Sequence, residues 1–296
     1  MKYQFMQQHE NEFSLKRMSK VFNVSRSGYY SFIKSELSAR SKENMRLLKI
    51  MKAIHEESRQ TYGSPRIHAE LISQGEKCSR KRVTRLMKQA GLQAKMKKRF
   101  KLTTRANPKA KAAPNLLKQN FSADKPNQRW VTDITYVATA EGWLYVAAVL
   151  DLFSRRIVGL SMSDRMTTDL VLNALNQAFL HRQPASGLIH HSDKGSQYTS
   201  KDFQKQLTLY CMIVSMSGTG NCYDNAAMES FFHTLKTEHT YFEHYNTREQ
   251  AKQSIFEYVE MFYNCKRSHS TLGYCSPMVF EQKWNQQQKF PLSSVH

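Results

Sequence analysis

The sequence of 296 residues predicts an α/β fold, a mixed five-stranded sheet with helices, preceded by an all-α segment. Apolar residues recur at helical spacing in the N-terminal third, whereas β-branched and aromatic runs alternate with amphipathic stretches after residue 128. Between the two parts lies RANPKAKAAPN, whose Pro, Ala and Asn content is typical of an extended linker. At about 150 residues per domain, the length suits two domains.

The basic charge of the chain is concentrated in the N-terminal part. Residues 1–120 carry 28 Lys and Arg against 8 Asp and Glu, whereas residues 121–296 carry 16 of each sign. Lys77 to Ala123 holds 15 basic residues and no acidic one. Because Lys and Arg neutralise phosphates, this balance predicts a nucleic-acid partner and salt-sensitive binding. The alternative, a solvated basic surface or tail, is disfavoured by the interleaved apolar periodicity.

Two helix-turn-helix units are predicted in this basic part, the first over residues 1–40. Within LKRMSKVFNVSRSGYYSFIK, NVS is the turn and Ser25 is placed to cap the second helix. One apolar face of the preceding helix is formed by Leu15, Met18 and Val21 or Phe22. One such prediction is weak by itself, but two basic units in tandem favour DNA binding more strongly.

The second unit is predicted over residues 41–100, where an amphipathic helix precedes SPRIHAELISQGEKCSRKRVTRLMKQAGL. Pro65 fits the first turn of one helix, and Ser79 is placed to cap the next, whose Val83, Leu86 and Met87 point inward. A recognition helix presents its N-terminal side chains to base edges in the major groove of DNA. The expected DNA contacts are Arg80, Lys81, Arg82 and Arg85, which face outward, with Lys97, Lys98 and Arg99 ahead of a basic linker over residues 101–123.

Residues 124–285 are predicted to form the α/β domain, which ends in a short helix at VFEQKW, with residues 286–296 as a tail. Three runs, RWVTDITYVAT, WLYVAAVLDLFS and RRIVGLSMS, indicate an antiparallel meander. The amphipathic helix TTDLVLNALNQAFLHR then leads to a fourth strand that ends at Asp193, and MIVSMS is a fifth. If the helix makes a right-handed crossover, the first and fourth strands are neighbours. Asp133, in the first strand, would then lie near Asp193 at one sheet edge.

Three acidic residues stand out in this domain. An unpaired carboxylate in a buried strand is costly, so Asp133 must pair with a neighbouring strand or bind a metal. Asp193, in HHSDKGSQY, could belong to a catalytic site or could instead form an Asx turn or a helix cap. Glu229 shares one stripe of the following helix with Phe232, His233 and Lys236, where an exposed ion pair is the alternative. Together the three carboxylates form an oxygen-only set that suits Mg²⁺ or Mn²⁺.

The motifs around these acids resemble those of a known group of enzymes. Asp133, Asp193 and Glu229, with 35 residues between the last two and Lys236 seven positions further on, are similar to the pattern of DDE transposases and retroviral integrases. The sequences of the individual motifs are closer still to those of the transposase of insertion sequence family three, in the product of its downstream reading frame. The matching segments are Ser25–Tyr30, Tyr62–Ile67, Trp130–Tyr136, His191–Tyr198, Gly220–Phe232 and Tyr263–Pro277.

The resemblance implies a ribonuclease-H-like catalytic core that cleaves DNA strands and joins them in copy-out, paste-in transposition. Asp133, Asp193 and Glu229 would be the catalytic residues and hold two Mg²⁺ (or Mn²⁺) ions, and Lys236 would contact DNA. The implied partners are double-stranded DNA, as element ends and target, the upstream-frame product, and further copies of the chain on DNA. Gly195 would allow close approach of the backbone, and Asn221, Asp224, Asn225 and His233 are expected either to support the ligands or to be caps and surface polar groups.

Two other functions remain open at this stage. A ribonuclease-H-like nuclease would keep the carboxylates without end-specific DNA binding, and a noncatalytic DNA-binding regulator would use the basic segment alone. Arg267 and His269, near the end of the domain, are expected either to bind the DNA backbone or to pack.

Several classes of protein are disfavoured by the sequence. No apolar run approaches the ~18 residues of a membrane span, and the N-terminus lacks the apolar core of a signal peptide, so we expect a cytoplasmic protein. The resemblance implies that it is bacterial and associated with the nucleoid. The five cysteines form no CxxC motif, which speaks against a zinc knuckle or a disulfide framework. His190 and His191 are adjacent on a strand and should point to opposite faces, which disfavours a zinc site.

Overall fold

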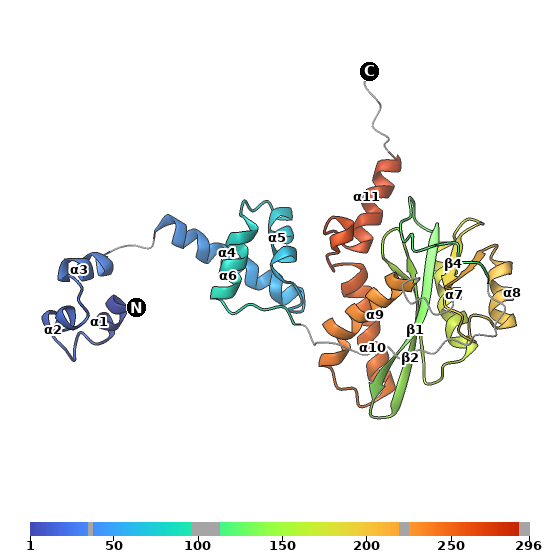
Figure 1. The fold of residues 1–296 in the computed structure, drawn as a ribbon, viewed down its shortest axis with the longest axis horizontal. Coiled ribbons are helices and arrows are strands. Elements are labelled where there is room, and N and C mark those ends of the chain that lie inside the picture. The colour runs from blue at the N-terminus through green and yellow to red at the C-terminus, as the bar shows by residue number, and fades with distance from the viewer. Residues whose placement is uncertain (35–37, 96–112, 219–224, 290–296) are drawn as a thin grey trace, which may run out of the picture.

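The computed structural model describes residues 1–34, 38–95, 113–218 and 225–289. Figure 1 shows two small helical units followed by an α/β domain. Within the described ranges, no helix combines the length and the apolar character that crossing a membrane requires.

The first helical unit has three helices, α1 (Lys2–Gln8), α2 (Leu15–Val21) and α3 (Arg26–Lys34), of which α1 was not predicted. Their small core consists of Met6, Met18 and Tyr29. The predicted cap is confirmed, since Ser25 Oγ accepts a hydrogen bond from the backbone N–H of Gly28 at 3.0 Å. The inclusion of Val21 in the apolar face was wrong, because this side chain is 75% exposed while Phe22 packs against the core.

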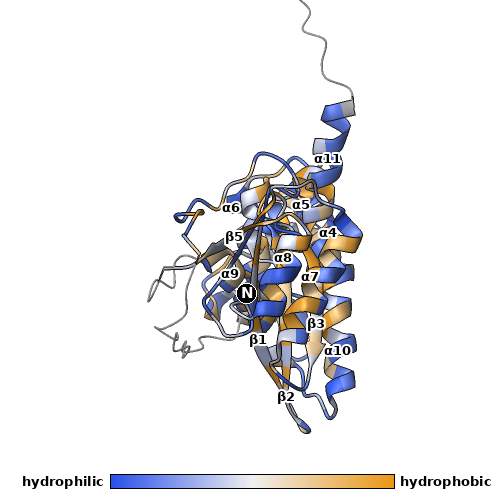
Figure 2. Cartoon of the chain, turned by 90° about the vertical axis from the view of Figure 1, so that its right-hand side faces the viewer, coloured by the Kyte–Doolittle hydropathy of each residue, from blue (hydrophilic) through white to orange (hydrophobic). Residues whose placement is uncertain are grey.

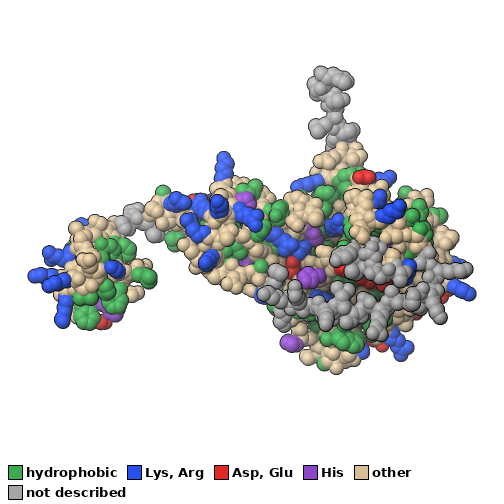
Figure 3. Space-filling view, viewed as in Figure 1, with side chains coloured by type: hydrophobic (Ala, Val, Ile, Leu, Met, Phe, Trp, Pro, Cys, Tyr) green, Lys and Arg blue, Asp and Glu red, His purple; other side chains and the backbone are tan. Residues whose placement is uncertain are grey.

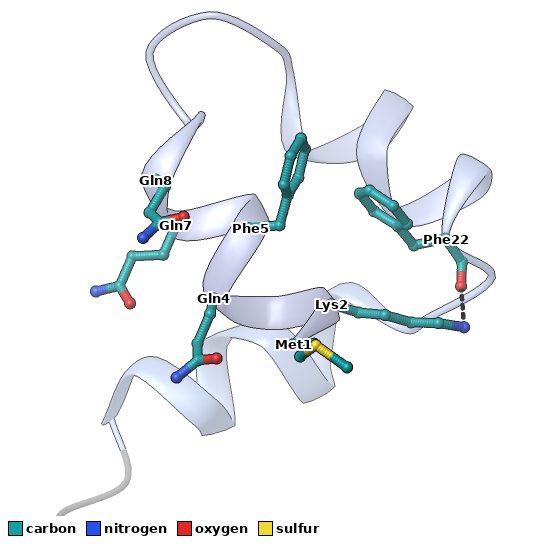
Figure 4. A pocket seen from close by; sticks show the side chains of 7 residues that line it. All are labelled: Met1, Lys2, Gln4, Phe5, Gln7, Gln8 and Phe22. Carbon is teal, nitrogen blue, oxygen red and sulfur yellow. Dashed lines mark hydrogen bonds between the residues drawn. The ribbon is translucent and has the colours of Figure 1, made fainter. Parts of the chain in front are cut away.

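A hollow on this first unit lies beside α1 (Figure 4). Its lining combines apolar and amide side chains, namely Met1, Lys2, Gln4, Phe5, Gln7, Gln8 and Phe22. Lys2 Nζ crosses one side of the hollow and donates to the carbonyl of Phe22 at 2.8 Å. The lining holds no acid, histidine or cysteine, so it carries none of the chemistry expected of the three carboxylates.

The second helical unit consists of α4 (Ala39–Glu57), α5 (Ser64–Ser73) and α6 (Arg80–Gln89). Pro65 lies in the first turn of α5, and Ser79 Oγ accepts a hydrogen bond from the N–H of Arg82 at 3.3 Å, as predicted for both residues. The inward positions of α6 are confirmed, and the core of the unit is formed by Leu47, Met51, Ile54, Ile67, Leu71, Val83, Leu86 and Met87. The amphipathic helix predicted at the start of this unit corresponds to α4 and contributes Leu47, Met51 and Ile54 to its core.

The α/β domain contains one mixed sheet of five strands in the order β3-β2-β1-β4-β5. The strands are β1 (Arg129–Thr139), β2 (Gly142–Asp151), β3 (Ile157–Ser163), β4 (Ile189–Ser192) and β5 (Ile213–Met216). The first three form the predicted antiparallel meander, and β4 pairs with β1 in parallel, with Val131 opposite His191. The predicted neighbourhood of the first and fourth strands is confirmed.

Helices cover both faces of this sheet (Figure 2). The helices are α7 (Thr168–Arg182), α8 (Lys201–Leu209), α9 (Ala226–Glu238), α10 (Arg248–Glu257) and α11 (Pro277–Lys289), with short helical turns over Thr240–Phe242 and Ser270–Leu272 and a π-helical segment over Tyr258–Asn264. Trp130 of β1 packs in one core with residues of α7 and α8. Its neighbour Val131 packs in the other core with residues of α9 and α10. This alternation follows from the two-residue period of a strand.

The C-terminal helix α11 is longer than predicted and runs past residue 285, where a tail was expected to begin. It carries Glu281, whose side chain is buried against the turn between β2 and β3 and against α7. Glu281 accepts hydrogen bonds from Ser154 Oγ at 2.7 Å, from Arg156 Nη1 at 3.0 Å and from both terminal nitrogens of Arg182 at 2.8 Å. This network attaches α11 to the end of β2 and to α7.

The loop between α4 and α5 joins the second helical unit to the α/β domain. Tyr62 Oη accepts a hydrogen bond from the N–H of Ser268 at 2.6 Å and donates one to the carbonyl of Lys266 at 3.3 Å. Arg66, on α5, lies 3.4 Å from a carboxylate oxygen of Glu238, the last residue of α9. The second unit is thus attached to the helix that carries Glu229.

Replacing Tyr62 with phenylalanine is expected to weaken this attachment. The change removes the acceptor of the Ser268 N–H, which is buried, and an unsatisfied buried donor costs about 1–3 kcal/mol. Hydrogen exchange of the Ser268 amide should therefore accelerate, and urea unfolding should show a lower free energy of unfolding. Tyr30→Phe is the matched control, because Tyr30 is 52% exposed. Equal exchange rates in the two variants would contradict the assignment.

Candidate active site

Asp133 and Asp193 lie on neighbouring parallel strands at the same height. Val131 and His191 are partners in the β1–β4 ladder. Asp133 lies two residues after Val131, and Asp193 lies two residues after His191. Both side chains are half-buried. Asp133 Oδ1 accepts a hydrogen bond from the N–H of Ile134 at 2.8 Å. The two acids therefore lie at the same height, Asp133 in the middle of the longer strand β1 and Asp193 directly after the end of β4.

A glycine supports the turn that follows Asp193. The N–H of Gly195 donates to Asp193 Oδ1 at 2.9 Å. A Cβ atom at position 195 would lie 2.9 Å from this same oxygen and 3.3 Å from Gln197 Oε1, so a larger residue would push on the carboxylate. The expectation that Gly195 allows close approach of the backbone is confirmed by this geometry.

Glu229 reaches the same region from α9. The helix begins after Asn225, whose Nδ2 donates to the carbonyl of Thr132 at 3.3 Å, next to Asp133. Asn225 Oδ1 is buried and accepts no hydrogen bond from the described residues. Glu229 lies in the first turn of α9 and is half-buried. The start of the helix is thereby fixed against the strand that carries the first aspartate.

The electrostatics of the three acids show that their negative charges are mutually unfavourable. Burial and the nearby carboxylates of Asp193 and Glu229 together raise the pKa of Asp133 to about 8, against the opposing effects of the Ile134 N–H and Lys236. Burial also raises the pKa of Asp193 and that of Glu229. Carboxyl groups with raised pKa values that face one another resist simultaneous ionisation. A cation bound between them would relieve that repulsion.

The donor set of this site fits a hard divalent cation, although its geometry is not yet that of a metal site. All three acids offer carboxylate oxygens, which Mg²⁺ and Mn²⁺ prefer. In the described ranges, no three His, Cys, Asp or Glu side chains are arranged closely enough to hold an ion. Metal binding would therefore require side-chain rearrangement of these acids.

Residues behind the two aspartates have partners that fix their positions. Tyr198, which is buried, places its hydroxyl 3.3 Å from Thr132 Oγ1 on the strand beside Asp133. His191 lies between two serine hydroxyls, Ser215 Oγ at 2.8 Å and Ser217 Oγ at 3.2 Å. His190 instead stacks edge-on with the ring of Phe203 on α8. The two histidines have different neighbours, as expected for adjacent residues of a strand.

Lys236 lies two turns beyond Glu229 on α9 and is half-buried. Its Nζ is 4.9 Å from the centroid of the Tyr136 ring. Burial lowers the pKa of Lys236, and the Asp133 carboxylate partly offsets this effect. The stripe predicted on this helix is thus divided, since His233 is exposed while Phe232 is buried.

The residues predicted to contact DNA from α6 do not all face outward. Arg80, Lys81 and Arg85 are exposed, and Figure 3 shows basic side chains over the second helical unit. Arg82 is half-buried, and its Nε donates to Asn44 Oδ1 on α4 at 2.8 Å. The outward orientation expected of Arg82 was wrong, because the start of α6 packs close to α4. Lys97, Lys98, Arg99, Asn221 and Asp224 lie outside the described residues.

Of the two roles left open for Arg267 and His269, the structure favours packing. Arg267 is buried and donates to both carboxylate oxygens of Glu238, at 2.7 Å from Nε and 2.6 Å from Nη2. His269 Nε2 lies 3.2 Å from Arg267 Nη1. Glu238 was missed from the sequence. Its helical position nine residues after Glu229 gave no signal, because its partner lies in a distant loop.

The mixed five-stranded sheet, with one acid within β1, one directly after the neighbouring parallel strand β4 and one on a following helix, defines an integrase-type catalytic core of the ribonuclease-H-like class. Two family models described as "Integrase core domain" match the chain. One matches residues 123–222 and the other matches residues 229–284. The "HTH-like domain" model matches residues 42–100. The chain is therefore a DDE-type polynucleotidyl transferase with a DNA-binding helical unit, of a family that depends on divalent metal ions.

Full-length relatives narrow the identification further. The chain is 46% identical over 91% of its length to an insertion element IS600 protein of 31 kDa from Shigella sonnei, covering 99% of that protein. It is 42% identical over 96% of its length to transposase InsF for insertion sequence IS3A from Escherichia coli strain K12, again covering 99% of the relative. The chain belongs to the family of IS3 transposases, and its partner is DNA.

Solved retroviral structures show a more distant likeness. The catalytic core domain of BIV integrase is 15% identical, with a TM-score of 0.42, over 55% of this chain and 99% of that chain. The HTLV-2 integrase catalytic core in complex with magnesium is 16% identical, with the same TM-score, over 54% of this chain and 99% of that chain.

Proposed function

We propose that Asp133, Asp193 and Glu229 are the catalytic residues of this transposase and together hold two Mg²⁺ or Mn²⁺ ions. The observation that carries the proposal is the electrostatic coupling of the half-buried Asp133 carboxyl group with those of Asp193 and Glu229, where Asp133 and Asp193 lie at the same height on paired parallel strands. Burying like charges together is costly unless a cation compensates them. Bound metal ions would activate the nucleophile and stabilise the departing oxygen at a phosphate.

The side chains of the site have different roles in the proposed reaction. The three carboxylates provide the negative ligand set, and the hydrogen bonds from Ile134 and Gly195 orient two of them. Lys236 supplies a positive charge beside Asp133 that suits a DNA phosphate. A water molecule or a DNA 3′-OH forms the new bond to phosphorus as the bond to the departing oxygen breaks. Cleavage and joining are then the same displacement, without a covalent protein intermediate.

The DNA-binding role belongs to the helical units. Arg80, Lys81 and Arg85 are exposed at and near the start of α6, where a recognition helix contacts bases and phosphates. We assign residues 1–40 and 41–100 to DNA binding, residues 101–123 to a basic linker and residues 124–285 to catalysis. The basic run at Lys97, Lys98 and Arg99 follows this unit in the sequence and carries the same sign of charge. The ligand we assign to it is the terminal inverted repeat of the element.

The reaction we propose is copy-out, paste-in transposition in the bacterial cytoplasm, at the nucleoid. One strand at one end is cleaved and joined near the other end, so both ends must be held together. Several copies of the chain on DNA would meet this requirement, with the upstream-frame product as a further partner. Basic charge concentrated in residues 1–120 supports the simultaneous binding of long DNA segments.

The test uses the full chain and labelled DNA that carries both ends of the element, with Mg²⁺ or Mn²⁺. Wild type is expected to nick and join the ends, and Glu229→Gln to do neither while it still binds DNA. Glu249→Gln is the matched control for the same chemical change, since the Glu249 side chain is 82% exposed on α10. Metal-dependent nicking without joining would favour a nuclease or the need for the upstream-frame product. Binding without cleavage by wild type would favour a regulator.

A further inference from the structure

Two large aromatic side chains are exposed on the hairpin formed by β1 and β2. Tyr136 is 36% exposed and Trp143 is 51% exposed. Their ring centroids are 4.8 Å apart with the planes at 75°, so the edge of one ring meets the face of the other. Ala138 is the register partner of Trp143, which places the two rings diagonally across the strands. The pair forms an aromatic wall on an otherwise well-packed domain.

The aromatic wall, Tyr136 and Trp143, lies close to the candidate active site. Tyr136 follows Asp133 by three residues in β1, so its side chain points to the other face of the strand, about 10 Å further along it. Lys236 links the two places, since its Nζ lies 4.9 Å from the Tyr136 ring centroid and its charge interacts with the Asp133 carboxylate. A DNA strand whose phosphate lies at the carboxylates and beside Lys236 would pass this wall.

The hairpin that carries the wall is held in place by several hydrogen bonds. Arg248 Nε, at the start of α10, donates to the carbonyl of Trp143 at 3.1 Å, and the N–H of Arg248 donates to Glu141 Oε2 at 2.8 Å. The N–H of Ala140 donates to the carbonyl of Tyr245 at 2.9 Å. Figure 1 shows that the hairpin reaches the lower edge of the domain. A fixed wall loses little conformational freedom when it binds a ligand.

We propose that Trp143, supported by Tyr136, binds an unpaired nucleobase of the DNA strand that is cleaved and joined. This inference rests on the proposed function of the carboxylates. Aromatic side chains stack with single-stranded bases of any sequence, and the positive charge of Lys236 suits the phosphate of the same strand. DNA rises about 3.4 Å per nucleotide along a strand, so a base at this wall is on the order of three nucleotides from the reacting phosphate.

An unpaired base is the occupant that the geometry favours over duplex DNA. In a duplex both faces of each interior base are covered by its neighbours, so a ring face can receive a base only where stacking is interrupted. The terminal nucleotides at a cleaved end meet this condition. The charged neighbour also favours a nucleic acid over a second protein chain, because Lys236 and the wall present one cationic and aromatic surface.

The experiment uses the full chain with Glu229→Gln, so that bound DNA is not consumed, and element-end DNA with or without three unpaired terminal nucleotides. Adding Trp143→Ala is expected to weaken binding of the unpaired end about tenfold and to change binding of the blunt duplex less than about twofold. Trp143→Phe should restore most of the affinity. Leu209→Ala is the control, since Leu209 is 71% exposed on α8 and should have no effect.

A fluorescent base gives the direct readout. With 2-aminopurine at the third unpaired position, binding should quench its fluorescence when Trp143 is present and in the Trp143→Phe variant, but not in Trp143→Ala. Equal quenching with Trp143 and with Trp143→Ala would overturn the proposal, as would equal losses of affinity for unpaired and blunt DNA. A change in sedimentation of the DNA-free chain on Trp143→Ala would instead assign the wall to a protein interface. Nicking by the chain with Glu229 intact tests the proposed function separately.

Discussion

Conversion of Asp133 to asparagine is expected to lower strand cleavage at least about 1000-fold while DNA binding stays within about twofold. Asparagine keeps the size of the side chain but removes the carboxylate that, with those of Asp193 and Glu229, forms the proposed metal-binding set. Charge stabilisation by metal ions at a phosphate is worth several kcal/mol, and each 1.4 kcal/mol corresponds to about tenfold in rate. The rate of nicking of an end-labelled substrate measures the effect. Retention of more than about a tenth of the wild-type rate would remove Asp133 from the catalytic set.

The same variant is expected to change how stability depends on pH. The pKa of Asp133 is raised from 3.8 to about 8, chiefly by burial. Between these values the folded protein keeps a proton that the unfolded chain has lost. The free energy of unfolding of the metal-free wild type should therefore fall as pH rises through this window, by up to about 1.4 kcal/mol per pH unit.

Asp133→Asn should show a flatter dependence, because asparagine does not titrate. Urea unfolding between pH 5 and pH 9, without divalent metal, measures both curves. Magnesium ions should raise the Tm of wild type more than that of the variant, since the variant lacks one proposed ligand. Parallel curves for the two proteins would show that the raised pKa of this carboxyl does not govern the pH dependence.

Replacing Glu281 with alanine is expected to lower the free energy of unfolding by about 3–5 kcal/mol. Glu281 is 5% exposed and pairs with Arg182 and Arg156, and Arg182 also reaches Asp151 at 3.3 Å. Removing one partner of a buried ion pair leaves the other charge uncompensated, which accounts for this size of effect. Burial alone would raise the pKa of Glu281, but the hydrogen bonds from Arg182 and Ser154 hold it below its usual range.

Equilibrium urea unfolding of the full chain tests this prediction. Glu249→Ala is the control, because Glu249 forms an exposed pair with Lys252 and its side chain is 82% exposed. Exposed pairs of this kind contribute about 0–1 kcal/mol. Glu281→Gln should retain part of the network through its amide and fall between the two. A loss for Glu281→Ala no larger than that of the control would show that α11 is not held by these charges.

Local pattern was sufficient for most elements of the fold. The run RWVTDITYVAT coincides with β1 because β-branched and aromatic residues dominate it. Helix α1 was missed because Met6 is its one buried residue, which leaves little apolar periodicity to detect. Helix α11 was predicted too short because its last turns, rich in Gln and Lys, continue the helix by propensity beyond the apolar positions.

Only some residues of the candidate site could be predicted from the sequence. The three acids could be found because two follow strand signals and the third lies on a helical stripe. The roles of Arg82 and Arg267 could not be predicted, since the residues to which they donate hydrogen bonds, Asn44 and Glu238, belong to other helices. The aromatic wall also gave no signal, because Tyr136 and Trp143 become neighbours through the pairing of two strands.

The sequence by itself determined the division of charge, the order of helices and strands, and the identity and spacing of the acids. These properties depend on composition and on the short periods of helices and strands. The tertiary structure decided which side chains meet, as when Lys236 comes to lie over Tyr136 and Glu281 joins Arg182. Such contacts join residues far apart in the chain, and they exist only once the helices have packed on the sheet and buried their shared apolar faces.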